Sequence, residues 1–232
     1  MKIMSFNTQH CLSYKEGNID FALMADTIRT CGADIVGLNE MRNEGPHEEY
    51  VDQTKILSEL TGLSHSYFAK AIDVDGCNPY GNAILSRYPI THAETIMVPD
   101  PPADSVNGRA ETRCLLKVKL ENGLTVLVIH FGLNHSERVN AVQTVLENME
   151  KTKCILMGDF NAVPDDSVLN PIRECMKDAA EVFAKPLLSH PSDNPKRKID
   201  YIFVTPDIEV VSADIPAIVA SDHRPHTAEI RL

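Results

Sequence analysis

The chain has 232 residues, of which 43% are hydrophobic and 24% charged; this suits one large globular domain and excludes a disordered or membrane-embedded chain. Its 33 acidic and 22 basic residues give a formal net charge of −11, which opposes non-specific binding to the phosphate backbone of duplex nucleic acid. No apolar run approaches the roughly 20 residues that span a bilayer, and no signal-peptide core is present, so we expect a cytoplasmic protein with no transmembrane segment.

Short apolar runs rich in β-branched residues predict strands, and the amphipathic stretches between them predict helices. The expected strands are, in chain order, 2–6, 35–38, 83–85, 112–120, 124–129, 154–157, 199–204 and 227–230. The expected helices cover 18–31, 48–61 and 136–150, and Asn18 or Asp20 is suited to cap the first. Segment 98–104 is expected to be a loop, because prolines interrupt both helix and sheet hydrogen bonding.

The alternation of strands and helices predicts a layered α/β fold. Short turns at 86–89 and 121–123 join neighbouring strands, which favours mixed or antiparallel sheets over a doubly wound parallel sheet. No repeat, low-complexity tract or long linker divides the chain, so we expect a single domain over 1–232.

The six cysteines are scattered through the chain and form no CxxC pair; they stand at 11, 31, 77, 114, 154 and 175. A disulfide framework is unusual in a domain of this size, so we expect reduced thiols that the fold does not need for its stability.

The most informative segment is Gly158-Asp159-Phe160-Asn161, directly after the apolar strand 154–157. Residues two apart lie on the same side of an extended chain, so Asp159 and Asn161 would share a face. A carboxylate beside an amide can hold a water, a metal ion or a phosphate oxygen. Since Asp, Gly and Asn are also common in turns, this segment alone leaves a turn and a site both open.

A second polar segment, 221–225, precedes the last expected strand. Asp222 offers a metal ligand, and His223 offers a proton donor near neutral pH or a charge opposite phosphate, although a polar loop is an alternative interpretation. An acyl-transfer triad of Ser221, Asp222 and His223 is disfavoured, because consecutive side chains diverge and the chain has no GxSxG turn.

Four further strand ends carry polar residues, and three of them have a structural alternative. Asp200 stands at the mouth of an apolar strand, where a carboxylate needs a partner such as a histidine unless it is exposed. Glu40 follows strand 35–38 and is a hard oxygen ligand of the kind that Mg²⁺ prefers, or simply an acid before a helix. His130 ends strand 124–129, where a hydrogen-bonded core histidine is the ordinary alternative, and Asn7 ends the first strand.

The set is more informative than any member, because active sites of α/β proteins assemble where strand ends meet. These residues also lie in blocks that closely resemble the endonuclease/exonuclease/phosphatase family, which includes deoxyribonuclease I, abasic-site endonucleases, neutral sphingomyelinases and inositol-polyphosphate 5-phosphatases. The blocks follow the family's order and are SFNTQH (5–10), GLNE (37–40), GNAILSRYPI (81–90), HFG (130–132), GDFNA (158–162), KIDYIF (198–203) and SDHRP (221–225).

The resemblance implies a four-layer α/β sandwich, in which two mixed β-sheets pack face to face and are flanked by helices. It implies that Glu40 is the main ligand of a Mg²⁺ or Mn²⁺ ion, with Asn7 and Asp222 nearby. The metal would act as a Lewis acid and a template for in-line attack by water.

The resemblance also implies catalytic roles for five residues. Asp159 would orient or deprotonate the attacking water, and Asn161 would contact the scissile phosphate. His223, held by Asp200, and His130 would stabilise the charge that develops in the transition state.

The chain departs from the family in features that bear on the substrate. Segment 37–40 reads GLNE where the family more often has LQE, and the chain contains no Trp and none of the long insertions with which DNA-directed members grip a duplex. The one tight basic cluster, 195–198, would hold a substrate phosphate or be a solvated loop. We therefore expect a hydrolase that cleaves a phosphodiester or phosphomonoester of a small or lipid-like substrate. The alternative is a nuclease of the abasic-site endonuclease or exonuclease type acting on DNA or RNA.

Overall fold

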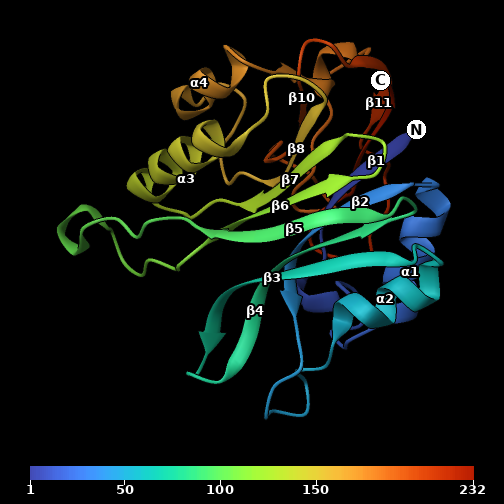
Figure 1. Ribbon diagram of the computed structural model, residues 1–232. Helices are drawn as coiled ribbons and strands as arrows, with labels where there is room; N and C mark the ends of the chain where they lie inside the picture. The colour runs from blue at the N-terminus through green and yellow to red at the C-terminus, as the bar shows by residue number, and fades with distance from the viewer.

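The computed structural model describes residues 1–232 and contains two six-stranded sheets (Figure 1). In spatial order the first sheet consists of β11 (Glu209–Asp214), β12 (His226–Arg231), β1 (Lys2–Asn7), β2 (Ile35–Arg42), β4 (Asn78–Ser86) and β3 (His65–Val74). The second consists of β5 (Ile90–Met97), β6 (Cys114–Leu120), β7 (Thr125–His130), β8 (Cys154–Asp159), β10 (Asp200–Val204) and β9 (Lys177–Asp178). Both sheets are mixed, since β1 pairs in parallel with β2 and β7 in parallel with β8, whereas the other neighbouring pairs are antiparallel.

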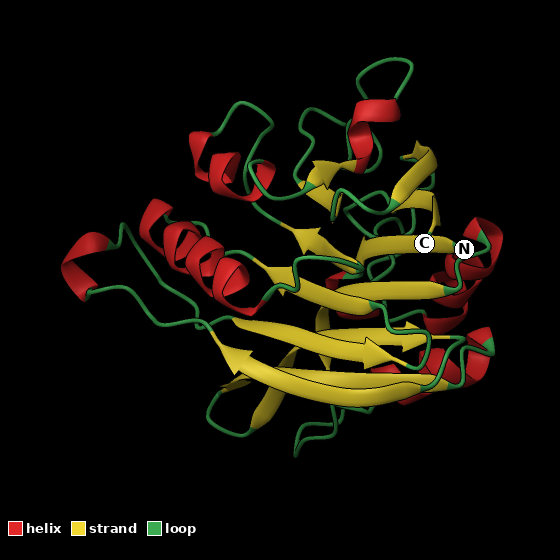
Figure 2. Cartoon of the chain, turned by 45° about the horizontal axis from the view of Figure 1, so that its top comes forward, coloured by secondary structure: helices red, strands yellow, loops and turns green.

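The helices lie on the outer faces of the two sheets (Figure 2). They are α1 (Phe21–Cys31), α2 (Gln53–Thr61), α3 (His135–Asn148) and α4 (Asn170–Arg173), with 3₁₀ turns at Gln9–Cys11, Ala103–Ser105, Ser167–Leu169 and Ala179–Val182. None of the helices is both long and apolar enough to cross a membrane.

Three apolar clusters hold these layers together. The middle cluster lies between the sheets and includes Ile35 from the first sheet and Val128 from the second. On one outer face, Ile28 of α1 and Leu57 of α2 pack against the first sheet. On the other, Val145 of α3 packs against the second sheet. This order of helices, sheet, sheet and helices confirms the expected four-layer sandwich.

The helix boundaries follow the capping residues. Helix α1 begins after Asp20, whose carboxylate accepts the backbone N–H of Leu23, so Asp20 and not Asn18 is the cap. The expected helix 48–61 starts only at Gln53, because Asp52 caps it by accepting from Lys55 N. The segment 48–52 was therefore wrongly assigned to the helix. Helix α3 starts at His135, one residue before the expected start, behind a capping box made by Asn134 and Glu137.

The expected strands all form, although several extend beyond their predicted limits and others were missed. The expected strand 83–85 is the end of the longer β4, and strand 112–120 begins only at Cys114. Strands β3, β5, β9 and β11 were not predicted, because their residues are mostly partly buried or exposed and form no long apolar run. All six cysteines are free.

A buried histidine at the start of β12 links the stability of the fold to pH. His226 is fully buried, its ring packs 5.5 Å from that of Phe183, and its Nε2 has no hydrogen-bond partner. Burial, and next the charge of Lys198, lowers the pKa of His226 to about 4. Between pH 6.5 and 4 the unfolded chain therefore binds a proton at this position that the folded protein does not.

We predict that lowering the pH from 7 to 5 reduces the free energy of unfolding by about 2 kcal/mol through His226 alone. Urea unfolding measures the free energy of unfolding at both pH values. The decrease from pH 7 to pH 5 should be smaller for His226→Gln than for the wild type, whatever the stability of the variant at pH 7. His92→Gln, which changes an exposed histidine of β5, serves as the control. An unchanged pH dependence in His226→Gln would show that this histidine is not the acid-sensitive group.

Candidate active site

The strand register brings polar strand ends from both sheets to one edge of the sandwich. In the second sheet Asp159 pairs with His130 on one side and with Asp200 on the other. In the first sheet Asn7 lies beside Asn39. The two sheets meet at this edge, so residues distant in sequence become neighbours.

Asp159 lies at the centre of this cluster and is only 2% exposed. Its Oδ1 accepts the backbone N–H of Asn161 at 2.9 Å, and its Oδ2 accepts from Asn7 Nδ2 at 3.1 Å. The same Oδ2 lies 3.5 Å from His130 Nε2 and 3.6 Å from His223 Nε2. One carboxylate oxygen thus faces an amide and two imidazole rings.

Glu40 reaches the cluster through an irregularity in β2. The register of β2 against β4 shifts between Leu38 and Met41, and Glu40 has a positive φ of 61°. A bulge of this kind redirects a side chain that regular pleating would point elsewhere. Its Oε1 accepts from Asn7 Nδ2 at 2.9 Å, so one amide links Glu40 to Asp159.

Strained backbone concentrates around these residues. Besides Glu40, positive φ values occur at Asn161 (47°) and at the consecutive residues Gln9, His10 and Cys11 (48°, 48° and 65°). Such conformations are costly for residues other than glycine and are typical of functional sites whose surroundings enforce them. The loop after β1 and the turn after β8 therefore adopt backbone conformations that the surrounding structure enforces, and these conformations set the directions of the side chains at the site.

Gly158 explains how β7 and β8 meet so closely at the site. A Cβ atom at this position would lie 1.8 Å from the carbonyl oxygen of Ile129, and the residue has a φ of 151°. Only glycine fits at this position. Gly158 is therefore needed for the packing of β8 against β7, which in turn positions Asp159.

His223 is anchored by a second buried carboxylate. Its Nδ1 lies 2.8 Å from Asp200 Oδ2, and Asp200 is completely buried. Burial opposes the charged form of His223, but the charges of Asp200 and Asp159 outweigh it and raise the pKa of His223 above its ordinary value. We therefore assign His223 as a cation.

His130 lies in the opposite electrostatic environment. Burial, and then the charges of Arg113 and His223, lowers its pKa well below the ordinary value. Arg113 Nη1 lies 3.1 Å from His130 Nδ1 and 2.7 Å from Glu111 Oε1. Since arginine can only donate, His130 accepts at Nδ1 and is neutral. One cationic histidine, His223, and one neutral histidine, His130, therefore flank the Asp159 carboxylate.

Asp222 and Asn161 complete the set expected from the sequence. Asp222 is close enough to Glu40 for its charge to affect the pKa of that residue, and its Oδ1 accepts from the Ser221 hydroxyl at 2.9 Å. That hydroxyl is buried and bonded to Asp222 rather than to the His223 ring, which leaves no acyl-transfer triad. Asn161 Nδ2 lies 3.2 Å from His130 Nε2 and donates to Phe131 O at 3.0 Å.

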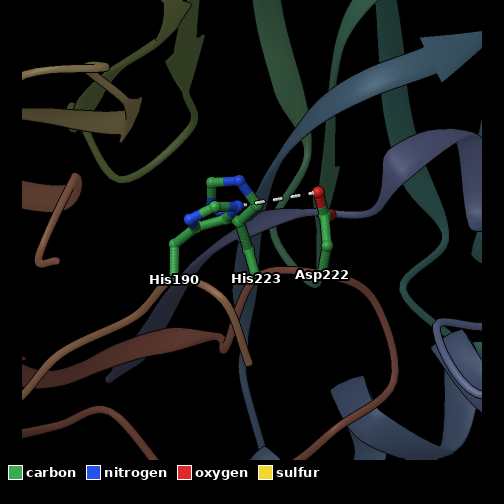
Figure 3. Close-up of side chains that lie close together, drawn as sticks. All are labelled: His190, Asp222 and His223. Atoms are coloured by element: carbon green, nitrogen blue, oxygen red, sulfur yellow. Dashed lines mark ion pairs between the residues drawn. The ribbon is translucent and has the colours of Figure 1, made fainter. Parts of the chain in front are cut away.

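Two groups of side chains bring three ligand-capable atoms close together. One comprises Asp159, Asp200 and His223 and is fully buried. The other comprises His190, Asp222 and His223 (Figure 3), and its first two members are partly exposed.

The sequence interpretation missed Arg113, His190 and the role of Asn39. Arg113 stands in the polar segment before β6, and His190 in a loop rich in proline and serine, so neither follows an apolar run. Asn39 lies directly after the expected strand 35–38, next to Glu40, where the sequence indicates only a departure from the family pattern.

Asn39 is fully buried and connects the two sheets beneath the site. Its Oδ1 accepts from Asp159 N at 3.0 Å, and its Nδ2 donates to Ile129 O at 3.0 Å and to Asn82 Oδ1 at 2.8 Å. Three buried polar groups thus depend on one amide, and the backbone of Asp159 is among them.

We predict that Asn39→Ala lowers the free energy of unfolding by at least about 2 kcal/mol, since each buried polar group left unpaired costs about 1–3 kcal/mol. Urea denaturation measures the loss. Asn18→Ala, at an exposed position, should stay within about 0.5 kcal/mol of the wild type. A similarly small change for Asn39→Ala would contradict the structural role given to this amide.

Comparison with known proteins shows the fold and the family of the chain. The chain is 28% identical to the uncharacterized protein YbhP of Escherichia coli K12, covering 90% of this chain and 87% of that protein. It superposes on an endonuclease/exonuclease/phosphatase of Beutenbergia cavernae with a TM-score of 0.80 at 23% identity, covering 100% of this chain and 71% of the other. For a mannosyl-6-phosphatase of Bacteroides thetaiotaomicron the TM-score is 0.78 at 17% identity, with full coverage of both chains. The sequence profile of the endonuclease/exonuclease/phosphatase family matches residues 4–223, and the chain therefore belongs to that family.

Proposed function

We propose that the protein is a Mg²⁺- or Mn²⁺-dependent phosphoesterase that cleaves an ester of a small or lipid-like molecule by in-line attack of water. The observation that carries this proposal is the environment of Asp159 Oδ2, which lies within 3.6 Å of Asn7, His130 and His223. A base beside one cationic and one neutral imidazole suits an attack in which a proton is lost while negative charge grows on phosphate.

Asp159 is the group that receives the proton of the attacking water. Burial raises the pKa of Asp159, although the charge of His223 opposes the shift. The raised pKa makes the Asp159 carboxylate a stronger base than the carboxylate of an exposed aspartate. Asn7 Nδ2 and Asn161 N fix the orientation of the two carboxylate oxygens, so the acceptor is held in place before water arrives.

His223 and His130 stabilise the charge that the phosphoryl oxygens acquire. His223 does so as a cation whose Nδ1 is held by Asp200, and His130 as a neutral ring held by Arg113. Asn161 presents its amide beside His130 and binds a phosphate oxygen from the same side. These donors need little rearrangement, and such preorganisation is a large contribution to catalysis in many enzymes.

The residues around Glu40 fit a hard divalent cation. Burial raises the pKa of Glu40; the Asn7 hydrogen bond opposes this shift and the nearby Asp222 carboxylate adds to it. A bound divalent cation would relieve the repulsion between the Glu40 and Asp222 carboxylates, and oxygen donors suit Mg²⁺ or Mn²⁺. Asn7 is the third candidate ligand. Its Nδ2 donates to Glu40 and its Oδ1 accepts from Gln9 N. The Asn7 amide would therefore have to rotate before its oxygen could bind a metal ion. When bound, the ion would supply Lewis-acid stabilisation of phosphate.

We predict that EDTA abolishes hydrolysis and that added Mg²⁺ or Mn²⁺ restores it. Glu40→Gln should raise the metal concentration needed for half-maximal activity and weaken metal binding in calorimetry, because one charged ligand is lost. Glu44→Gln, which neutralises an exposed carboxylate of the following loop, is the matched control. Full activity in EDTA would rule out the metal-dependent mechanism.

The proposed substrate class is supported by the charge of the chain and by one of its fold neighbours. A net charge of −11 repels a polyanion, and the chain has no Trp. A fold neighbour named as a mannosyl-6-phosphatase supports a small phosphomonoester as the substrate. A nuclease remains the second candidate, because the family includes enzymes that cleave nucleic acids.

We predict that kcat/KM for the best small phosphoester exceeds that for long duplex DNA at about 150 mM salt. The panel should include nucleotides, sugar phosphates, phospholipid head groups and labelled oligonucleotides, each with Mg²⁺ and with Mn²⁺. Any cleavage of duplex DNA should weaken further as salt is raised. A tenfold or greater preference for duplex DNA would favour the nuclease instead.

A further inference from the structure

A short hairpin, residues 189–198, is docked on the loop that carries Asp222 and His223. Ser192 donates from its backbone to Asp222 O at 2.7 Å and from its hydroxyl to Ser221 O at 2.6 Å. Arg224 donates back, from its backbone to Ser189 O at 2.8 Å and from its Nε to Ser192 O at 2.6 Å. Four bonds between two loops fix the hairpin relative to the catalytic cluster.

The hairpin places His190 against the ring of His223. The ring centroids are 4.6 Å apart, and the His190 side chain keeps 22% of its surface exposed. Figure 3 shows His190 and His223 side by side, with Asp222 next to them. His190 is therefore a titratable side chain at the mouth of the site to which the mechanism above assigns no role.

The partner of His190 Nδ1 determines what its other nitrogen can do. Arg197, across the hairpin, places Nη2 3.1 Å from His190 Nδ1. Because a guanidinium only donates, Nδ1 must be the acceptor and the ring proton must lie on Nε2. Nε2 faces Asp222 Oδ2 at 4.0 Å, which is too long for a hydrogen bond. His190 thus presents an unused N–H donor beside His223.

This tautomer argues against His190 as a metal ligand, although Asp222 and His223 lie near enough for a shared ion. A ligating histidine needs a free lone pair on the nitrogen that faces the metal and usually donates its other N–H to an acceptor. Here the nitrogen that faces Asp222 carries the proton, and the other is bonded to a cation. The arrangement suits an anion at Nε2.

We infer that His190 is a further substrate-contacting residue, which donates Nε2–H to an oxygen of the substrate phosphate, and that Arg197 is a positioning residue that fixes its tautomer. The inference rests on the proposed function, because it requires that the phosphoester binds next to His223. His190 adds a neutral donor next to the His223 cation, so the two rings bind neighbouring oxygens of one phosphate.

The test compares two replacements of His190 in the full-length protein with Mg²⁺ present. His190→Phe keeps a flat ring against His223 and removes the donor, whereas His190→Gln keeps a side-chain N–H. Affinity for inorganic phosphate, measured by calorimetry, and kcat/KM for a small phosphoester should both fall about 10- to 100-fold in His190→Phe, the loss of one hydrogen bond to a charged group. His190→Gln should lose less, and His92→Phe on β5 should match the wild type.

Nitrogen-15 chemical shifts of the histidine rings test the role of Arg197. His190 should show the Nε2–H tautomer in the wild type and a mixture in Arg197→Met, which removes the donor, with unchanged thermal melting. Unchanged phosphate affinity and kcat/KM in a folded His190→Phe variant would overturn the substrate contact, and an Nδ1–H tautomer in the wild type would overturn the role of Arg197. A wild-type protein that neither binds phosphate nor hydrolyses any phosphoester would overturn the proposed function itself, which distinguishes the two failures.

Discussion

A carboxylate buried where two sheets meet is the constraint on which the rest of the site depends. Asp159 is 2% exposed, and a negative charge in such a place must be compensated by donors and cations. The structure supplies Asn7 from the first sheet, His130 from the neighbouring strand and His223 from the loop before β12. The two histidines are held in turn, His130 by Arg113 and His223 by Asp200.

The same constraint explains why the supporting residues lie in the core. Asn39 accepts from the backbone of Asp159, and Gly158 allows the strand that carries Asp159 to approach Ile129. Neither residue can contact a substrate, but both decide where the Asp159 carboxylate lies. Positioning and stability therefore depend on the same hydrogen bonds, and changes beneath the site should affect both.

Much of the fold and of the site could be predicted because apolar strands ended by polar residues leave a clear pattern. Asn7, His130 and Asp159 were expected at strand ends. The strand register makes His130 and Asp159 neighbours, and the packing of the two sheets brings Asn7 against Asp159. The bulge that turns Glu40 inward has no sequence signal, since it depends on the pairing of β2 with β4. The positions of Arg113 and His190 depend on contacts between segments far apart in the chain, which no local pattern records.

The central claim is that Asp159 and His223, which lie 64 positions apart (223 − 159), act on one transition state. The most direct measurement is kcat for Asp159→Asn, His223→Ala and the double variant on the best substrate, with thermal melting as the control for folding. Each single change should lower kcat by roughly 10²–10⁴-fold. The double variant should lose far less than the product of the two single losses, because groups that act together lose their effect together. Losses that multiply, or a near-normal kcat in His223→Ala, would contradict this account.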